Sequence, residues 1–211
     1  MPTARPPHSV HADGRPRCGW LGDNPQMLRY HDREWGVPLH GDKRLFAKLI
    51  LDGFQAGLSW AIILRKREGF LRAFDGFDPD RMAHYDAARR RRLLADAGIV
   101  RNRQKIAAAI GNARAFLDLR DSGVSFGAFL WDFVDGRPLQ HAWKTLRQIP
   151  ARSPESERMS KALIERGFRF VGPTICYAFM QAVGMVNDHL VTCFRYSELK
   201  RPRLPARRRS R

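Results

Sequence analysis

The sequence predicts an all-α fold, and three observations lead to that prediction. Apolar residues recur at helical spacing in several segments, as Ile106, Ile110 and Leu117 do within residues 105–119. No segment alternates apolar and polar residues as a half-buried strand does, and the connections between the helical segments are short. A chain of 211 residues is long enough to bury a sizeable core, in one domain or in two interlocked halves.

The first expected helices follow from local start and stop signals. Asn24-Pro25 begins a turn or a first helix. Asp42 is a candidate N-cap for a helix whose apolar positions fall between Leu45 and Ile50. The glycines at 53 and 57 break that helix, so we expect an apolar helix to resume over residues 61–64.

The second half of the chain carries a similar series of signals. Asp78-Pro79 is a strong helix start, because a capping carboxylate precedes a proline at the first position, and the helical face then continues to Gly98. Ser153-Pro154 starts a later helix in the same way. The other expected segments are a helix over 105–119, a short apolar segment over 126–133 that ends in a turn, and an apolar helix from about Ile175 to Val183.

The charge distribution suggests one domain between two basic tails. We expect a helical domain over residues 17–197, built of two interlocked halves with the functional site between them, and disordered arginine-rich tails over 1–16 and 198–211. The net charge of +17 and a pI near 11.0 indicate a polyanionic partner, and nucleic acid is the first candidate. The tails hold part of this charge, but segments such as Arg89–Arg92 leave the body basic as well.

The remaining composition excludes two classes of protein. Three cysteines do not make a disulfide scaffold, and they fit an intracellular, reducing compartment better. The apolar runs are too short to span a bilayer, and the N-terminal segment lacks the apolar core of a signal peptide.

Two ligand pairs at opposite ends of the chain are candidates for a metal site. His189 and Cys193 stand four residues apart, which would place them on one face of a helix and suit zinc. Cys18 and His31 are spaced too widely to identify a site by themselves. The alternative is that these are buried core residues, which is how we interpret Cys176.

A glycine-flanked turn between two helical patterns, residues 167–174, is a candidate phosphate site. Gly172 can adopt backbone geometry that other residues avoid, and Pro173 fits the first turn of the following helix. Thr174 and the free N–H groups could then hold a DNA phosphate without reading sequence. The turn resembles the helix-hairpin-helix of DNA repair proteins, and the alternative is a plain corner between two helices.

The longest motifs resemble one family. The segments CGW, YHDREWGVP, FQAGLSW, DAGI, IGNARAF, SKAL, RGFRFVGPTICYAFMQA and NDHLVTC are similar to those of the DNA-3-methyladenine glycosylase I family, over roughly residues 17–196. The resemblance implies an all-α helix-hairpin-helix fold with a structural Zn²⁺ that joins the two ends of the domain. The implied zinc ligands are Cys18, His31, His189 and Cys193.

The resemblance also implies a base-binding pocket. Trp60 matches the family's stacking tryptophan and Tyr30 its pocket tyrosine, and we expect Trp20 to add another wall. An electron-rich pocket of this kind selects a cationic base by stacking and cation–π attraction. Without the resemblance, the same aromatic residues are more typical of core packing.

Asp52 is a departure from the family pattern. The family has a glutamate before Gly-x-Gln whose carboxylate hydrogen-bonds the edge of the flipped base, whereas this chain has Asp52 before Gly53-Phe54-Gln55. Aspartate keeps the charge but is one methylene shorter, so it reaches the base through a backbone shift or a water, or binds more weakly. We predict that Asp52 is the catalytic residue; the alternative is that it only ends its helix.

Other residues are expected at the DNA surface or in the elbow after the hairpin. Leu58 could fill the gap that the flipped base leaves. In the elbow, Asn187 stands where the wider superfamily carries a catalytic aspartate, and the helix after the hairpin lacks a lysine, so a Schiff-base lyase step is not expected. The predicted DNA-contacting residues are Gln55, Gly57, Leu58, Gly172 and Thr174.

The implied function is base excision repair by a monofunctional glycosylase. It would flip 3-methyladenine out of alkylated double-stranded DNA and release it by hydrolysis, leaving an abasic site. The implied setting is a monomer in the bacterial cytoplasm, associated with the nucleoid through DNA. One alternative is a non-enzymatic binder of alkylated or distorted DNA on the same scaffold, and another is a zinc-stabilised helical protein with a basic surface.

Overall fold

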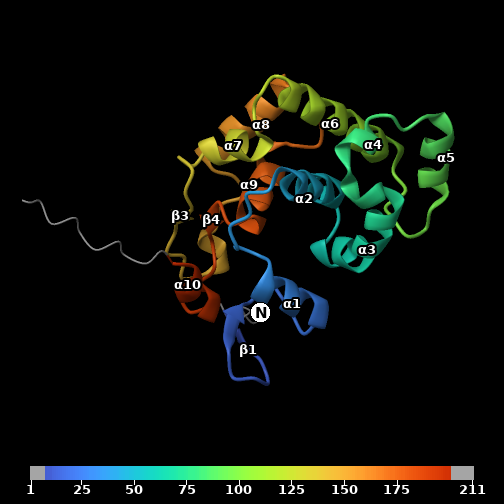
Figure 1. Ribbon diagram of the computed structural model, residues 1–211. Coiled ribbons are helices and arrows are strands. Elements are labelled where there is room, and N and C mark those ends of the chain that lie inside the picture. Colours follow the sequence, from blue (N-terminus) through green and yellow to red (C-terminus); the bar gives the residue numbers. More distant parts are fainter. Residues whose placement is uncertain (1–7, 201–211) are drawn as a thin grey trace, which may run out of the picture.

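The computed structural model describes residues 8–200, and helices dominate them (Figure 1). The mostly helical architecture predicted from the sequence is confirmed. The α-helices are α1 (Pro25–Arg33), α2 (Asp42–Gln55), α3 (Trp60–Ala73), α4 (Pro79–Met82), α5 (Ala87–Ala95), α6 (Arg103–Asp121), α7 (Phe126–Asp132), α8 (Pro154–Glu165), α9 (Pro173–Ala182) and α10 (Phe194–Leu199). Two short 3₁₀ helices are η1 (Asp75–Phe77) and η2 (Leu146–Gln148).

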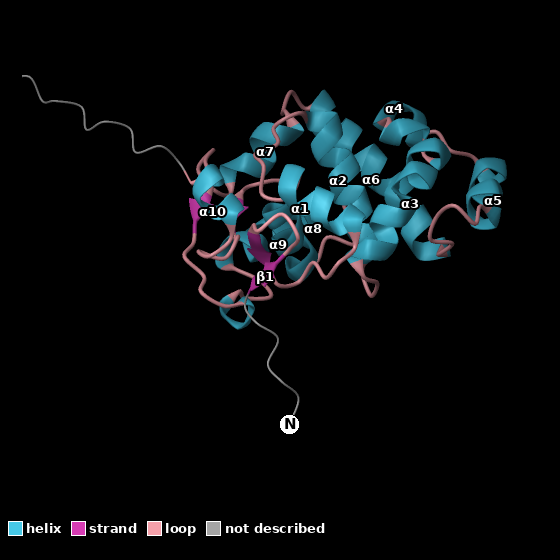
Figure 2. Ribbon diagram, turned by 90° about the horizontal axis from the view of Figure 1, so that it is seen from below, coloured by secondary structure: helices cyan, strands magenta, loops and turns pink. Residues whose placement is uncertain are grey.

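Four short strands were not expected from the sequence. Strands β1 (His8–Val10) and β2 (Pro16–Cys18) form an antiparallel hairpin, and β3 (Leu139–Gln140) pairs in parallel with β4 (Val186–Asn187). Figure 2 shows how small these strands are beside the helices. Two or three residues are too few to establish an alternating pattern, which is why the sequence did not reveal them.

The hairpin β1–β2 corrects the expected N-terminal boundary. Residues 8–16 belong to ordered structure, whereas the sequence predicted a disordered tail through residue 16. Arg17 explains part of this order, because its guanidinium pairs with Asp13 at 2.6 Å and with Asp32 in α1 at 2.7 Å. The predicted C-terminal tail from residue 198 overlaps the end of α10. The remaining tail segments, 1–7 and 201–211, lie outside the described residues.

The central element is α2, which contacts α3, α6, α7 and α9. Its apolar face joins a large core that includes Phe46, Phe54 and Phe116. A second, smaller core forms around Cys18, Tyr30 and other residues of the N- and C-terminal segments. Trp60 packs against both cores. The boundary between the two cores is therefore where a cavity can form.

The helix start signals were predicted with mixed success. Asp78 accepts a hydrogen bond from Arg81 N and caps α4, as expected, but the helix stops at Met82 and a new one starts after Asp86 instead of running on to Gly98. Asp42 does not cap its own helix. It is the first residue of α2, and its carboxylate accepts from the backbone N–H groups of Phe126 and Gly127 at the start of α7. This cap links two helices that are far apart in sequence.

None of the helices within residues 8–200 is long and apolar enough to cross a membrane.

Candidate functional site

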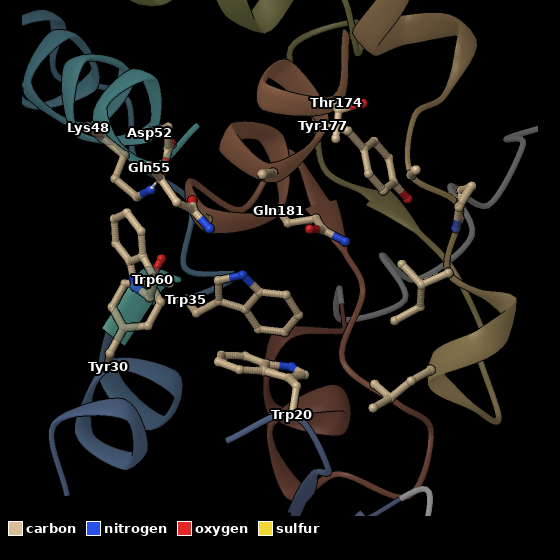
Figure 3. Close-up of a pocket in the computed structure, with 16 residues that line it drawn as sticks. Trp20, Tyr30, Trp35, Lys48, Asp52, Gln55, Trp60, Thr174, Tyr177 and Gln181 are labelled. Carbon is tan, nitrogen blue, oxygen red and sulfur yellow. Dashed lines mark hydrogen bonds and ion pairs between the residues drawn. The ribbon is translucent and has the colours of Figure 1, made fainter. Parts of the chain in front are cut away.

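A cavity of about 410 Å³ lies at the boundary between the two cores (Figure 3). We call it the base cavity. Its walls come from the segments before and after α1, from α1, α2, α3 and α9, and from residues 146–151. The lining residues used below are Trp20, Tyr30, Trp35, Lys48, Asp52, Gln55, Trp60, Thr174, Tyr177 and Gln181.

Aromatic rings form one side of the base cavity. Trp60, the first residue of α3, lies against Tyr30 of α1 with ring centroids 5.2 Å apart. Trp20 and Trp35 make a second pair, also 5.2 Å between centroids. The sequence analysis did not single out Trp35, although it stands in the same YHDREWGVP motif as Tyr30. Burial raises the pKa of Tyr30 well above its ordinary value, so its phenol stays neutral.

Asp52 lies on the α2 wall together with a lysine that the sequence analysis missed. Lys48, one helical turn earlier, donates a hydrogen bond to Asp52 Oδ1 and places its ammonium 4.1 Å from the Trp60 ring centroid. The second oxygen, Asp52 Oδ2, is buried and has no hydrogen-bond partner among the described residues. The alternative that Asp52 only ends its helix is wrong, because α2 continues to Gln55. The i, i+4 spacing of a lysine and an aspartate was the available signal.

A buried carboxylate holds the α9 wall. Asp188 Oδ2 accepts hydrogen bonds from Tyr177 Oη and Gln181 Nε2, both at 2.7 Å, and these two residues line the base cavity. Its other oxygen accepts from His141 at 2.6 Å and Trp143 at 2.8 Å. Burial alone would raise the pKa of Asp188, but these hydrogen bonds hold it below its ordinary value. Asp188 is therefore an anion that fixes the wall.

Asn187, the neighbour of Asp188, does not line the base cavity. Its side-chain amide donates to Gln140 Oε1 at 3.0 Å and to the Tyr196 carbonyl at 3.2 Å. These contacts tie β4 to the segments beside it.

Three of the residues predicted to contact DNA lie at the end of α2 and in the turn that leads to α3. Gln55 lines the base cavity, whereas Gly57 and Leu58 do not. Leu58 is 37% exposed beside the left-handed Gly57. Lys105 stabilises the turn, since its ammonium donates to the carbonyls of Phe54 and Ala56 at the end of α2.

The turn between α8 and α9 differs in one respect from the sequence prediction. Gly172 has φ −59°, which any residue adopts, so the expected special backbone geometry is wrong. The left-handed positions are Gly167 and Phe170 instead. Pro173 occupies the first turn of α9 as predicted, and Thr174 faces the base cavity. A Cβ at Gly172 would meet nothing within 4 Å, so this side of the turn is open.

The four predicted metal ligands meet in one buried cluster, which we call the metal centre. The ligand atoms of Cys18, His31, His189 and Cys193 all lie within 4.8 Å of one another. The segment from His189 to Cys193 is a turn before α10 and not a helix, so the expected shared helix face is wrong. The turn brings Cys193 Sγ to 3.5 Å from His189 Nδ1 all the same.

The geometry of the metal centre fits a tetrahedral ion. Zinc bound to sulfur and nitrogen at usual lengths separates the two donors by about 3.6 Å, and the observed sulfur–nitrogen distances are 3.4, 3.5 and 3.7 Å. Each imidazole also has an outer partner, Asp32 for His31 at 2.8 Å and the Trp35 carbonyl for His189 at 3.2 Å. The Cys18 thiol and both imidazoles lower the pKa of Cys193, which favours the thiolate that binds metal. The cluster could therefore hold a metal ion.

Comparisons with known proteins point to a single family. A sequence model described as methyladenine glycosylase matches residues 20–196. The chain is 49% identical over 180 residues to DNA-3-methyladenine glycosylase 1 of Escherichia coli (strain K12), and the match covers 85% of this chain and 96% of the relative.

Solved structures give the same answer. A crystal structure of 3-methyladenine DNA glycosylase I superposes with a TM-score of 0.83 at 49% identity, covering 84% of this chain and 98% of the other. A structure that describes 3-methyladenine recognition by 3-methyladenine DNA glycosylase I of Staphylococcus aureus superposes with a TM-score of 0.79 at 35% identity, covering 81% and 91%.

Proposed function

The chain belongs to the methyladenine glycosylase family, and from that premise we propose that it releases 3-methyladenine from alkylated double-stranded DNA at the base cavity. One observation carries the assignment to this site. Tyr30, Trp60 and Asp52 come from three different helices and line the same cavity of about 410 Å³. Stacking surfaces and a buried acidic group in one cavity are what recognition of an expelled base requires.

The chemistry asks little of the protein beyond capture and positioning. Methylation at N3 leaves the purine positively charged in DNA, so the base is already a good leaving group. When the bond between C1′ and N9 breaks, its electron pair moves to N9 and neutralises the base; a water then adds to C1′ and loses a proton. The aromatic walls exclude bulk water and hold the base by stacking and cation–π attraction, with Trp60 as the main platform.

The proposed DNA-binding site, which we call the DNA seat, is the hairpin formed by α8, the following turn and α9. Free N–H groups at the start of α9 and the open side of Gly172 suit a phosphate. Thr174 lies at this helix start and also lines the base cavity, so a phosphate held here would lie close to the flipped nucleotide. Leu58, exposed on the α2–α3 turn, is the proposed wedge for the vacated stack. The net charge of +17 supports association with the duplex.

The metal centre is the proposed site of a structural Zn²⁺. Cys18 and His31 would hold the ion from the N-terminal side, and His189 and Cys193 from the C-terminal side. A zinc with four protein ligands has no open position for catalysis, and it supplies a crosslink. Its effect on the reaction would be indirect, because Trp20 and Trp35 pack next to His31 and also line the base cavity.

The decisive experiment measures release of free 3-methyladenine from methylated duplex DNA by the zinc-loaded protein. We expect release that follows single-turnover kinetics, and we expect a folded Asp52→Asn variant to release the base more slowly. Retention of damaged duplex without any release would instead support the alternative of a non-enzymatic binder. The hydrogen bond from Lys48 to Asp52 is the observation that favours the non-enzymatic binder, because it occupies one oxygen of the carboxylate.

A further inference from the structure

Both charged groups of α2 line the base cavity, and the ammonium of Lys48 is the more exposed of the two. Lys48 and Asp52 stand one turn apart on α2, and the lysine side chain is 14% exposed while the aspartate side chain is 2% exposed. Figure 3 shows Lys48 reaching from α2 toward Trp60 and Gln55, beside Asp52. A base that enters the base cavity would therefore meet Lys48 first.

The hydrogen bonds of the pair lead to the same conclusion. Lys48 Nζ donates to Asp52 Oδ1 and lies over the face of Trp60, and it makes no other hydrogen bond to the described residues. An ammonium has three N–H donors, so at least one remains for a ligand. Asp52 Oδ2 is buried and has no hydrogen-bond partner among the described residues. The aspartate lines the cavity with little exposed surface, and its Oδ1 holds the more exposed ammonium in place.

We propose that Lys48 is a specificity-determining residue of this glycosylase, whose ammonium donates a hydrogen bond to the N7 acceptor of the expelled purine. Asp52 is then a positioning residue for that ammonium. This assignment rests on the proposed function, because it takes the base cavity as the place where the base binds.

The charges favour such a contact as the reaction proceeds. Asp52 balances the lysine, so the pair presents no net charge to an incoming cationic base. Cleavage of the bond to N9 returns an electron pair to the ring, so N7 becomes a stronger acceptor in the transition state than in the bound substrate. An ammonium at N7 therefore stabilises the transition state more than the ground state, which is the condition for acceleration. Burial also lowers the pKa of Lys48, which eases its approach to a positively charged base.

The same contact has a consequence for base preference. Guanine presents O6 and N7 as neighbouring acceptors, while adenine presents N7 beside an amino group. A hydrogen-bond donor at this place is compatible with both bases, so 3-methylguanine should also be released. Lys48→Met keeps a long unbranched side chain but removes the donor, and we expect it to lower 3-methylguanine release more than 3-methyladenine release.

A double-mutant cycle tests the contact directly. Calorimetry measures the affinity of the zinc-loaded full chain for free 3-methyladenine and for its 7-deaza analogue, in which a C–H replaces N7. In the natural protein we expect the analogue to bind about tenfold to a hundredfold more weakly, as for a lost hydrogen bond to a charged group. In Lys48→Met the two bases should differ by about twofold or less. Lys48→Arg, which restores a donor, should recover much of the difference.

Controls separate this inference from its premise. Lys43→Met removes an exposed lysine of the same helix, which pairs with Asp78, and should behave as the natural protein. Asp52→Asn should reduce the loss of affinity for the 7-deaza analogue, and Asp52→Glu, which keeps a carboxylate, should retain that loss. An equal penalty in the natural protein and in Lys48→Met, or no measurable binding of either base, overturns the role of Lys48. Release of 3-methyladenine from DNA without any dependence of binding on N7 would overturn the role of Lys48 and leave the proposed function intact. Binding that depends on N7 without release would support the role of Lys48 and overturn the proposed function.

Discussion

The metal centre and the base cavity are both assembled from buried polar groups of distant segments, but they differ in how those groups are satisfied. At the metal centre both imidazoles have an outer partner, and Cys18 Sγ accepts from the N–H of Leu190. In the base cavity Asp52 Oδ2 and Trp60 Nε1 are buried without a partner among the described residues. Buried polar groups without a partner cost stability, and a ligand can supply the missing partner at a binding site. The contrast separates a region built for cohesion from one built for binding.

The largest expected effect comes from breaking the metal centre. Cys193→Ala removes one of the four residues proposed to bind zinc, and a structural zinc contributes on the order of 10 kcal/mol of binding free energy. We expect the variant to lose the proposed zinc and to unfold at a much lower temperature, because that ion would crosslink both ends of the domain. Thermal unfolding with and without a chelator, together with zinc stoichiometry, measures this.

A matched variant sharpens the test. Cys176 is buried in the large core, and its thiol donates to the Val171 carbonyl at 3.2 Å, away from the metal centre. Cys176→Ala should keep the zinc and the sensitivity to chelator. A natural protein whose unfolding temperature is indifferent to chelator would show that the cluster is not a structural metal site.

The next effect should fall on the base cavity and affect activity more than stability. Trp60→Ala removes the proposed platform, and stacking of a base on an aromatic ring is worth about 1–3 kcal/mol. We expect release of 3-methyladenine to fall by roughly tenfold to a hundredfold, with zinc content unchanged. Single-turnover release and the unfolding temperature should be measured on the same preparation. Undiminished release would place base recognition outside this cavity.

Asp188→Asn tests the connection between the two regions. The carboxylate accepts four hydrogen bonds, two of them from cavity-lining Tyr177 and Gln181. An amide turns one acceptor atom into a donor, which leaves at least one buried partner unpaired. We expect a loss of about 1–3 kcal/mol in the free energy of unfolding, measured by urea denaturation, with a higher KM. Unchanged stability would mean that the network contributes little beyond what water supplies.

The sequence predicted local features well and long-range ones poorly. The caps at Asp78 and Ser153 were recognisable because donor and acceptor lie within one turn. The capping of α7 by Asp42 was not, since its partners are more than 80 residues away. How deeply each residue is buried in the base cavity also depends on long-range contacts. The sequence shows Lys48 and Asp52 as a pair, but only the fold shows which of the two side chains is more exposed in the cavity.

The four residues of the metal centre show a different limit of the sequence. Motif resemblance identified all four residues, while the spacing argument predicted a helix over 189–193 that does not exist. The four residues cluster despite this error, because a turn can bring residues four apart together as well as a helix can. The role of Asp188 as the anchor of one cavity wall was not predicted, because its four donors come from two other segments of the chain, residues 141–143 and α9.

Gly172→Ala should have the smallest effect on stability and isolates the DNA seat from both buried regions. The residue has φ −59° and ψ 161°, which alanine before a proline adopts readily, and an added Cβ meets nothing within 4 Å. We expect the free energy of unfolding to change by less than about 0.5 kcal/mol. Binding to duplex DNA should weaken several-fold, because the methyl group would stand where a phosphate approaches the N–H groups of α9. Gly184→Ala is the contrasting variant, since its Cβ would lie 2.5 Å from Pro38 N at φ +73° and should destabilise the fold. If Gly172→Ala leaves DNA affinity unchanged while Gly184→Ala unfolds as expected, the hairpin is a plain corner between two helices and the phosphate must be held elsewhere.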